Sequence, residues 1–504
     1  LTWEIIPGLT FKTDLAQFWS FSDNNRFYGY LTDTAAGNEN MPVAQITNTH
    51  NFKYTWTNTV NYALTLKDAH NLSFLLGQEI QHNQTKTNYQ ASRYFPQFTE
   101  PRSALNNMGL GSAYASTSSL TTPNRMASFF GQANYNFKHR YLLSATFRAD
   151  GSTRFAPGNQ WGYFPAISGA CVVSEEPWWN KDVVDNLKIR AAFGLSGNNN
   201  IGDDRWRYQY SINSSGGPSW GESTTTKDGD KYYASDNLFP NTDIKWETTI
   251  TRNLALDISM FKGRLTVTPE FYWNTTRDLL YRCQIPTTTG YSYQWQNVGK
   301  VSNKGIELAV NAALVRTKNF NLTMNFTYNM NFNRVDELPD GQDILYGSGW
   351  ASSGQTPRND FMLKEGKPVG LVRGYQYDGY YKVSDFDYDA STGVYKLKQG
   401  VPDISGNVYT AYPKPNELKV AAGQNAFPGA IKLKDLNGDG IVDSDDEGII
   451  GELQAHHTGV FGFSGNYKGL DFSASFTYQL GGKVYNASAM TQYTGGKEPG
   501  IGKN

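Results

Sequence analysis

A run of acidic and amide residues between Asp435 and Asp446 has the composition and spacing of a calcium-binding loop. It reads Asp-Leu-Asn-Gly-Asp-Gly-Ile-Val-Asp-Ser-Asp-Asp and matches D-x-[DN]-x-[DN]-G-x5-E, with aspartate in the last place. Oxygen donors at alternate positions suit a hard divalent cation, and the glycine permits a sharp turn. The predicted ligands of a structural Ca²⁺ are Asp435, Asn437, Asp439, the carbonyl of Ile441, Asp443 and Asp446. A metal-free Asp/Asn/Gly turn is the alternative, and the absence of flanking helix patterns argues against a regulatory EF-hand.

Large aromatic side chains gather in the segments that we expect to be loops. Tyrosine and tryptophan present a flat apolar face with a polar tip, which suits a sugar or a peptide. Alternatively, they pack loops against one another or form an aromatic belt at a membrane surface. The candidates for contact with a ligand or a partner are Trp206, Tyr208, Trp220, Trp295, Trp350, Tyr375 and Tyr377.

No pattern typical of an enzyme accompanies these residues. The sequence has no HExxH motif, no phosphate-binding loop and no Ser/His/Asp arrangement. The adjacent His456 and His457 could suggest a metal pair, but neighbouring side chains point apart on a strand, which favours plain surface or rim residues. Cys171 and Cys283 are too far apart in sequence to give a metal spacing, and we expect two free thiols. The net charge of −1 provides no field for binding nucleic acid.

The elements that must position these loops show a two-residue hydrophobic repeat. In residues 127–137 and 141–149, Phe129, Tyr135 and Phe147 lie among the apolar members of the repeat, and polar residues alternate with them. Successive side chains of a strand point to opposite faces, so this pattern predicts a hairpin with one apolar and one polar wall. Each arm has about ten residues, as a tilted strand needs to cross a bilayer.

Seven such hairpins predict about fourteen strands joined alternately by tight turns and long loops. Only 39% of the residues are hydrophobic, and no run of about 18 apolar residues predicts a transmembrane helix. We therefore expect an all-β fold, a transmembrane antiparallel β-barrel with long extracellular loops, rather than a soluble β-sandwich. The predicted loops are residues 23–43, 85–124 and 198–244, and a large insertion at 333–457 that contains the candidate calcium loop, 435–446.

Two details qualify the predicted walls. Asn and Thr alternate through residues 321–331, and unpaired amides of this kind are costly in a dry core, so this wall should face water or a polar plug. Arg252 falls on the apolar wall, where it fits only if its long side chain reaches a polar interface.

Several stretches together resemble the SusC/RagA-type TonB-dependent transporters of Bacteroidota. The resemblance runs from about residue 125 to 490, and the 432–443 stretch with 449–451 is the most specific. The other matching stretches are residues 155–165 with 174–176, 187–194 with 197–198, and 297–299 with 303–307.

The resemblance implies a barrel of about 22 strands in the outer membrane, with a lumen closed by an N-terminal plug. It also implies a SusD-like surface lipoprotein partner, energy from the TonB complex, and oligosaccharide or oligopeptide cargo. The sequence departs from the pattern because it shows no plug, no TonB-contacting segment and no terminal aromatic strand, and residues 452–457 replace a proline-rich run. We therefore expect a partial barrel, central and C-terminal, that lacks about a third of the family's strands. Import is the predicted function, and a passive porin or a surface-binding adhesion barrel is the alternative.

Overall fold

The computed structural model describes residues 1–504 except 68, 209, 213–231, 235–237, 348–358, 407, 409–416 and 487–504. Within these ranges, no helix has the length and apolar character needed to cross a membrane. The chain divides into two compact units. Unit 1 holds residues 1–263 and 274–298, and unit 2 holds residues 264–273 and 299–504.

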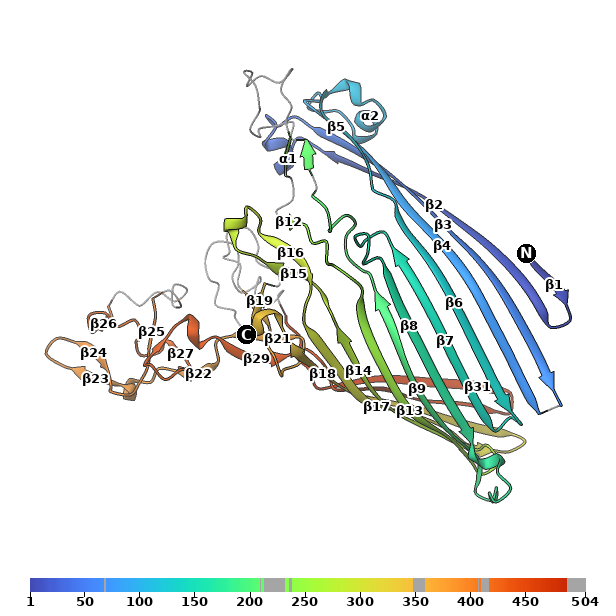
Figure 1. Ribbon diagram of the computed structural model, residues 1–504. Helices are drawn as coiled ribbons and strands as arrows, with labels where there is room; N and C mark the ends of the chain where they lie inside the picture. Colours follow the sequence, from blue (N-terminus) through green and yellow to red (C-terminus); the bar gives the residue numbers. More distant parts are fainter. Residues whose placement is uncertain are drawn as a thin grey trace. The chain divides into compact units, whose positions relative to one another are not determined.

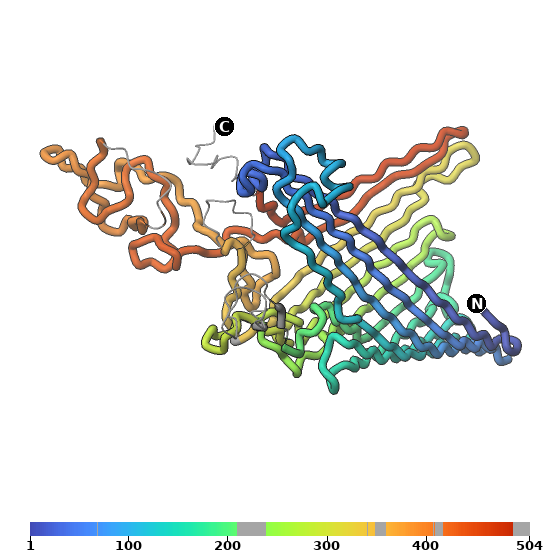
Figure 2. Tube along the Cα trace, turned by 90° about the horizontal axis from the view of Figure 1, so that it is seen from above, coloured from blue at the N-terminus to red at the C-terminus, as the bar shows by residue number. Residues whose placement is uncertain are grey.

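Unit 1 is built on long antiparallel strands that pair mostly in chain order, β1-β2-β3-β4-β6-β7-β8-β9-β13, with β5 on β4 outside this order. Figure 1 and Figure 2 show the strands from β2 to β8 running side by side. Their bounds are β1 Thr2–Ile6, β2 Leu9–Tyr28, β3 Val43–Leu66, β4 His70–Arg93, β5 Ser112–Leu120, β6 Asn124–Phe137, β7 Tyr141–Ser152, β8 Trp161–Val172, β9 Val184–Asn198 and β13 Glu247–Met260.

Short elements occupy the connections of unit 1. Two small sheets are formed by β10 with β11 and by β12-β16-β15. The bounds are α1 Asp33–Ala36, α2 Pro101–Asn106, η1 Met108–Leu110, η2 Val173–Glu175, β10 Tyr210–Ile212, β11 Tyr232–Ala234, β12 Leu238–Phe239, β15 Leu280–Gln284, η3 Thr287–Thr289 and β16 Tyr293–Asn297.

Unit 2 has a second run of long antiparallel strands, in the order β14-β17-β18-β30-β31. Their bounds are β14 Leu265–Arg277, whose last residues belong to unit 1, β17 Lys300–Arg316, β18 Phe320–Glu337, β30 His457–Tyr467 and β31 Leu470–Leu480. These strands and the long strands of unit 1 belong to one fifteen-stranded sheet. Fourteen of them follow one another in a single path of neighbours, and β5 pairs with β4 outside that path. The path therefore holds the fourteen strands that the sequence predicts.

The insertion of unit 2 lies between β18 and β30. It forms small sheets, β19-β20-β21-β29, β22-β27, β23-β24-β26 and β25-β28. The bounds are η4 Pro339–Gly341, β19 Ile344–Tyr346, β20 Phe361–Leu363, β21 Leu371–Gly374, β22 Tyr377–Tyr380, η5 Val383–Asp385, β23 Phe386–Asp389, β24 Val394–Leu397, β25 Asp403–Ile404, β26 Lys419–Val420, β27 Ile431–Leu433, β28 Ile441–Val442, η6 Ser444–Asp446 and β29 Gly448–Glu452.

The two walls predicted from the repeat are present on the long strands. On β6, Phe129 is 54% exposed, whereas its neighbour Ser128 on the opposite wall is 1% exposed. Phe129 pairs with Ala149 across β7, and Phe147 of the same wall is 51% exposed. We call the face of Phe129 and Phe147 the apolar wall, and the face of Ser128 the polar wall. An apolar face this exposed is typical of a surface that meets lipid.

Two predicted loop boundaries are wrong. The 23–43 loop is shorter, because β2 continues to Tyr28, and the 85–124 loop contains the end of β4 and all of β5. The hydrophobic repeat is needed only where a strand faces lipid. Beyond that band both walls are polar, so a strand can continue without the repeat that predicts it.

Candidate functional site

An arginine on the polar wall of unit 1 links acidic groups from two strands. Arg148 on β7 donates from Nε to both carboxylate oxygens of Asp150, at 2.8 and 3.0 Å. Its terminal nitrogen lies 3.6 Å from Glu79 on β4. Glu79 also accepts hydrogen bonds from Thr57 at 3.0 Å and from Gln81 at 2.8 Å. The network therefore connects three strands and leaves each carboxylate with a donor.

A ring on the same wall packs beneath this arginine. The Arg148 guanidinium lies 5.2 Å from the centre of the Phe130 ring, an arrangement that attracts the cation to the ring face. The ring lies over Gly77 so closely that a Cβ there would be 2.2 Å from it. The aromatic residue on the polar wall thus depends on a glycine in the neighbouring strand.

A row of small side chains crosses unit 1 on the polar wall. The residues pair directly from strand to strand, through Ser73, Asn134, Ser144, Ser168, Ala192 and Asn253. Their small size leaves an open hollow of about 860 Å³. Arg190 borders it and donates to both oxygens of Asp257 across β9 and β13, at 2.9 and 3.0 Å. The hollow is therefore a polar surface with a fixed ion pair at its edge.

The polar wall of unit 2 carries the predicted Asn and Thr residues. Tyr272 donates to Asn331 at 2.9 Å, and Asn333 donates to Asn303 at 2.8 Å. Thr323 and Thr327 are exposed on this wall. These groups suit contact with water or with another polar segment, as predicted.

Several amide oxygens on the polar wall have no protein hydrogen-bond partner. They are inaccessible to solvent as atoms and belong to Asn51, Asn83, Asn136, Asn274 and Asn329. A buried amide oxygen without a partner costs free energy, so native structures rarely leave one unsatisfied. The same wall also carries exposed hydroxyl groups, such as those of Thr323 and Thr327, that are open to water or to another polar segment.

A buried aromatic cluster lies at the loop end of β7, β8, β9 and β13 in unit 1. Phe155, Phe164 and Trp246 form its centre, and Trp246 donates from its indole to the carbonyl of Gln160 at 2.8 Å. A Cβ at Gly197 would be 2.0 Å from the Phe164 ring. Packing therefore explains much of the aromatic and glycine content of residues 155–165 and 187–198.

The predicted aromatic contact residues of unit 1 have different surroundings. Trp206 and Trp295 pack against the cluster of Phe155 and Trp246. Tyr208 is 53% exposed and meets the edge of Phe239, with ring centres 6.2 Å apart. Packing is thus the observed environment of both tryptophans, and Tyr208 offers an accessible ring. Trp220 and Trp350 lie outside the described residues.

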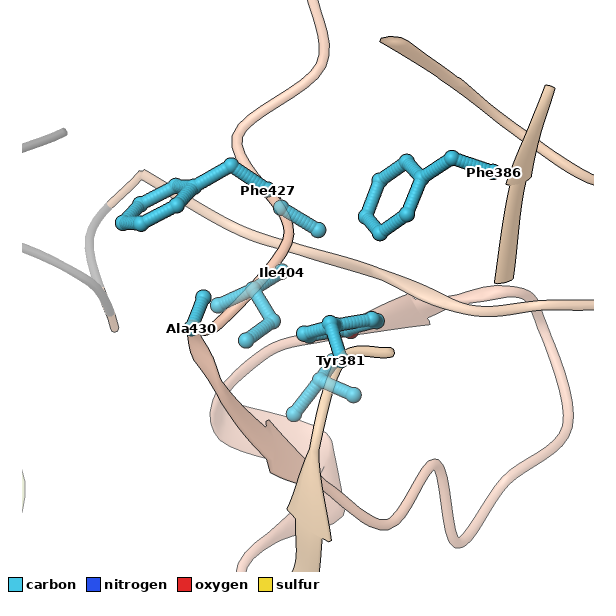
Figure 3. Close-up of a cluster of buried hydrophobic side chains, with 7 residues drawn as sticks. Tyr381, Phe386, Ile404, Phe427 and Ala430 are labelled. Atoms are coloured by element: carbon cyan, nitrogen blue, oxygen red, sulfur yellow. The ribbon is translucent and has the colours of Figure 1, made fainter. Parts of the chain in front are cut away.

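The insertion has a small hydrophobic core of its own. Figure 3 shows Tyr381, Phe386 and Phe427 gathered around Ile404 and Ala430. Tyr381 is 1% exposed, and its hydroxyl donates to the carbonyl of Pro402 at 2.7 Å. A polar tip with a partner lets this ring be buried without an unsatisfied group.

The other two predicted aromatic contacts lie beside this core. Tyr375 packs against it. Tyr377 instead is 60% exposed and meets the edge of Tyr380, which is 57% exposed, with ring centres 5.9 Å apart. Tyr377 and Tyr380 therefore form an accessible aromatic pair on the insertion.

The candidate calcium loop is a compact turn held by its own carboxylates. Asp435 accepts hydrogen bonds from the backbone N–H groups of Gly438 at 2.6 Å and Gly440 at 2.9 Å. Asp439 accepts from Asn437 Nδ2 at 3.1 Å and from Ile441 N at 2.9 Å. Both glycines have positive φ angles, 79° and 89°, which glycine adopts without steric cost.

The last residue of the loop is fully buried. Asp446 is 0% exposed and accepts from the backbone N–H groups of Leu436, Asn437 and Asp443, at 2.6, 3.2 and 2.9 Å. Burial raises its pKa, but these hydrogen bonds outweigh burial, so the pKa lies below the usual aspartate value. Asp446 thus supports the turn whether or not a cation is present.

The donor set of the loop is compatible with a hard cation, but its oxygens are turned toward the backbone. Among the described residues, no three His, Cys, Asp or Glu side chains are gathered as a metal site. Asp443 accepts from Asp445 N at 2.9 Å, so each predicted carboxylate ligand already has a donor in the loop. Calcium binding stays a prediction.

The remaining chemistry-bearing residues have structural surroundings. Cys171 and Cys283 are not joined in a disulfide. His456 lies 3.1 Å from Glu452, whereas His457 lies 2.7 Å from the Tyr328 hydroxyl. The two histidines therefore have separate partners. The link of Arg148 to Glu79 escaped the sequence analysis because it depends on the register between β4 and β7, which are far apart in sequence. The link to Asp150, two residues along β7, needs only the alternation of the strand.

Comparison with known proteins gives the same architecture. TonB-dependent receptor P26 of Formosa agariphila is 32% identical over 445 residues, 86% of this chain and 40% of that protein. SusC of Bacteroides thetaiotaomicron is 28% identical over 479 residues, 94% of this chain and 40% of that protein. The chain thus spans less than half the length of these relatives.

A solved structure agrees with these relatives at the level of fold. The structure of the RagAB peptide transporter superposes with a TM-score of 0.75 at 19% identity, over 98% of this chain and 48% of that chain. The family described as "TonB dependent receptor-like, beta-barrel" matches residues 2–487. With its long antiparallel strands and its separate apolar and polar walls, the chain belongs to the TonB-dependent receptor β-barrel family of the bacterial outer membrane.

Proposed function

We propose that this chain is the barrel portion of an importer that carries oligosaccharides or oligopeptides into the periplasm. The observation that carries the proposal is the polar wall, with its hydrogen-bonded Asn, Thr and Tyr side chains and the hollow of about 860 Å³. In an outer-membrane barrel the apolar wall meets lipid, so the polar wall lines the lumen. A lumen lined by polar side chains suits a polar plug and a polar cargo.

The family supports active transport as the mode of import. TonB-dependent receptors use energy from the inner membrane, and the SusC/RagA type works with a SusD-like surface lipoprotein. We propose the same partner and the same energy source for the full-length protein that contains this chain. The RagAB structure is that of a peptide transporter, and SusC is a TonB-dependent receptor. Oligosaccharide and oligopeptide cargo stay the two alternatives that the SusC/RagA resemblance implies.

Growth of a deletion strain tests the proposal. The strain is complemented with the full-length protein, or with the protein lacking its TonB-contacting segment, and is supplied with defined oligosaccharides or oligopeptides as sole nutrient. Active import predicts growth only with the intact protein. Equal growth with both proteins would indicate a passive porin, and no growth defect in the deletion strain would indicate an adhesion role.

A purification experiment tests the partner and the cargo. The full-length protein, extracted in mild detergent through an affinity tag, should bring down a SusD-like lipoprotein in a stoichiometric amount. Mass spectrometry of the small molecules released on denaturation distinguishes glycans from peptides. Recovery of the barrel without a lipoprotein after crosslinking in cells contradicts the proposed partnership.

A further inference from the structure

An arginine lies on the lipid-facing apolar wall of unit 1. Arg252 on β13 pairs directly with Phe193 on β9, which in turn pairs with Ile167 on β8. Phe193 is 45% exposed and Ile167 is 51% exposed. Leu254, two residues further along β13, is 45% exposed on the same wall. Arg252 therefore does lie on the apolar wall, as its place in the repeat predicts.

The Arg252 cation lacks an acidic partner. In the described part of the chain, no carboxylate forms an ion pair with it, and its hydrogen bond to the Thr275 hydroxyl is long, at 3.4 Å. The acidic groups nearby serve other residues. Asp257 is paired with Arg190 on the polar wall, and Asp278 lies 3.3 Å from Lys245. Glu247 accepts from Asn198 and from the backbone of Leu280.

The position of Arg252 along the strand places it toward the cell exterior. β13 starts at Glu247, after the long 199–246 connection, and ends in the tight turn at Lys262. In outer-membrane barrels the long loops are external and the short turns periplasmic. Arg252 thus lies in the outer half of the membrane, close enough to the interface for its side chain to reach the headgroups.

A second cation is found at the same end of the hairpin. Arg277 is the last residue of β14 and follows Thr275 by two positions, so alternation puts both on the wall of Arg252. Its side chain is 55% exposed and forms a long ion pair with the neighbouring Asp278, at 4.0 Å. Arg252 and Arg277 therefore present two guanidinium groups on one wall, in the part of the hairpin away from the tight turn, and the Thr275 hydroxyl is bonded to the first of them.

We propose that Arg252, Thr275 and Arg277 bind the phosphate of an anionic membrane lipid in the outer leaflet. An unpaired cation among lipid chains is costly, and a phosphate at the headgroup level removes that cost. Guanidinium groups match phosphate oxygens with paired N–H donors. Thr275 supplies a third donor from the same wall.

Native mass spectrometry of the full-length protein tests this site. The protein is released from nanodiscs of phosphatidylcholine containing either phosphatidylglycerol or monophosphoryl lipid A, and the bound lipid is counted. Each Lys or Arg near the surface contributes about a fivefold preference for anionic lipid. Arg252→Leu should therefore lower retention of anionic lipid about fivefold, and Arg252→Leu with Arg277→Leu should lower it further.

Matched variants separate the site from general charge. Lys262→Gln removes a cation from the opposite, tight-turn end of the hairpin, so any loss that it causes measures the general effect of charge, and the loss in Arg252→Leu should be larger. Arg252→Lys should keep part of the retention of anionic lipid. Loss with both lipids supports recognition of phosphate in general, and loss with lipid A alone identifies lipid A as the source. Equal retention by wild type and Arg252→Leu with both lipids, or an equal loss in Lys262→Gln, overturns the proposal.

Discussion

Arg148 and Asp150 are two residues apart on one strand, and a single Nε–H of the arginine serves both oxygens of the aspartate, at 2.8 and 3.0 Å. Residues two apart on a strand share a wall, which brings their side chains together. Asp150 is 6% exposed, so this donor replaces water as the partner of its oxygens. The same arginine also faces Glu79, which makes it the shared cation of two carboxylates on the lumen wall.

Replacing this cation should destabilise unit 1. Arg148→Leu leaves Asp150 and Glu79 without their shared cation, at a cost on the order of 1–3 kcal/mol in the free energy of unfolding. Urea unfolding of the full-length protein in lipid vesicles measures it. Adding Asp150→Asn and Glu79→Gln should restore much of the loss. Lys12→Gln, which breaks an exposed pair with Asp14, is the control and should leave the free energy of unfolding nearly unchanged, because water screens the pair.

A methyl group at Gly77 should be poorly tolerated. Its Cβ would lie 2.2 Å from the Phe130 ring, so Gly77→Ala should cost about 1–3 kcal/mol through overpacking, and Phe130→Leu in the same protein should relieve it. Gly131→Ala is the matched control, because its Cβ would be 3.2 Å from the mobile end of Leu76. Equal melting temperatures for the two alanine variants would contradict the packing described for Phe130.

The sequence predicts the fold well because the lipid imposes a simple pattern. All fourteen strands of the main path follow from the two-residue repeat, and Phe129 and Phe147 lie on the exposed wall as predicted. The extensions of β2 and β4 were not predicted, because strands beyond the lipid need no apolar wall. Apart from Tyr114 and Leu120, β5 (Ser112–Leu120) carries only small and polar residues. No hydrophobic repeat therefore indicates this strand.

The site is less predictable because it depends on contacts between distant strands. Glu79 and Arg148 are ordinary polar-wall residues in sequence, and only the register of β4, β6 and β7 brings them together. The loop aromatics have the same limitation. Composition treats Trp295 and Tyr377 alike, whereas the structure packs the first against a cluster and exposes the second.

Acid should weaken the turn that Asp446 supports. Because the folded-state pKa of Asp446 lies below its ordinary value, its contribution is complete above the unfolded-state pKa, about 3.9. The contribution is lost as the pH falls from there through the lower folded-state pKa. Limited proteolysis of the insertion between pH 7 and pH 2.5 should show faster cleavage at the lowest pH values.

Amide substitutions isolate this effect. Asp446→Asn should speed cleavage already at pH 7 and flatten the pH dependence. Both carboxylate oxygens of Asp446 accept hydrogen bonds, whereas the NH₂ group of an amide cannot accept one. Asp389→Asn is the comparison, since hydrogen bonds from Ser391 and Thr392 hold the pKa of the exposed Asp389 at about 2. It should leave cleavage near residue 446 unchanged. An unaltered pH profile in Asp446→Asn would contradict the assigned role.

Calcium, if it binds the 435–446 loop, should stabilise the folded protein by mass action. We expect the wild-type melting temperature to fall when a chelator removes Ca²⁺, and Asp435→Ala with Asp439→Ala to abolish that difference. Isothermal titration with CaCl₂ provides a second readout. A wild-type melting temperature that is the same with and without chelator would refute calcium binding, and Asp446 would then act through its backbone hydrogen bonds alone.

Replacement of Trp295 and of Tyr377, two of the predicted aromatic contact residues, should have different effects on stability and on uptake. Trp295 packs against the cluster of Phe155 and Trp246, so Trp295→Ala should lower the free energy of unfolding by about 2 kcal/mol through lost apolar burial. Tyr377 is 60% exposed beside Tyr380, so Tyr377→Ala should leave the free energy of unfolding within about 0.5 kcal/mol of wild type.

If Tyr377 contacts cargo, its replacement should reduce uptake of the oligosaccharide or oligopeptide that supports growth. Tyr377→Phe should keep most of that uptake, because stacking needs only the ring. Unchanged uptake in Tyr377→Ala would assign the exposed pair to another surface role, and a destabilised Tyr377→Ala would show that the ring packs like that of Trp295.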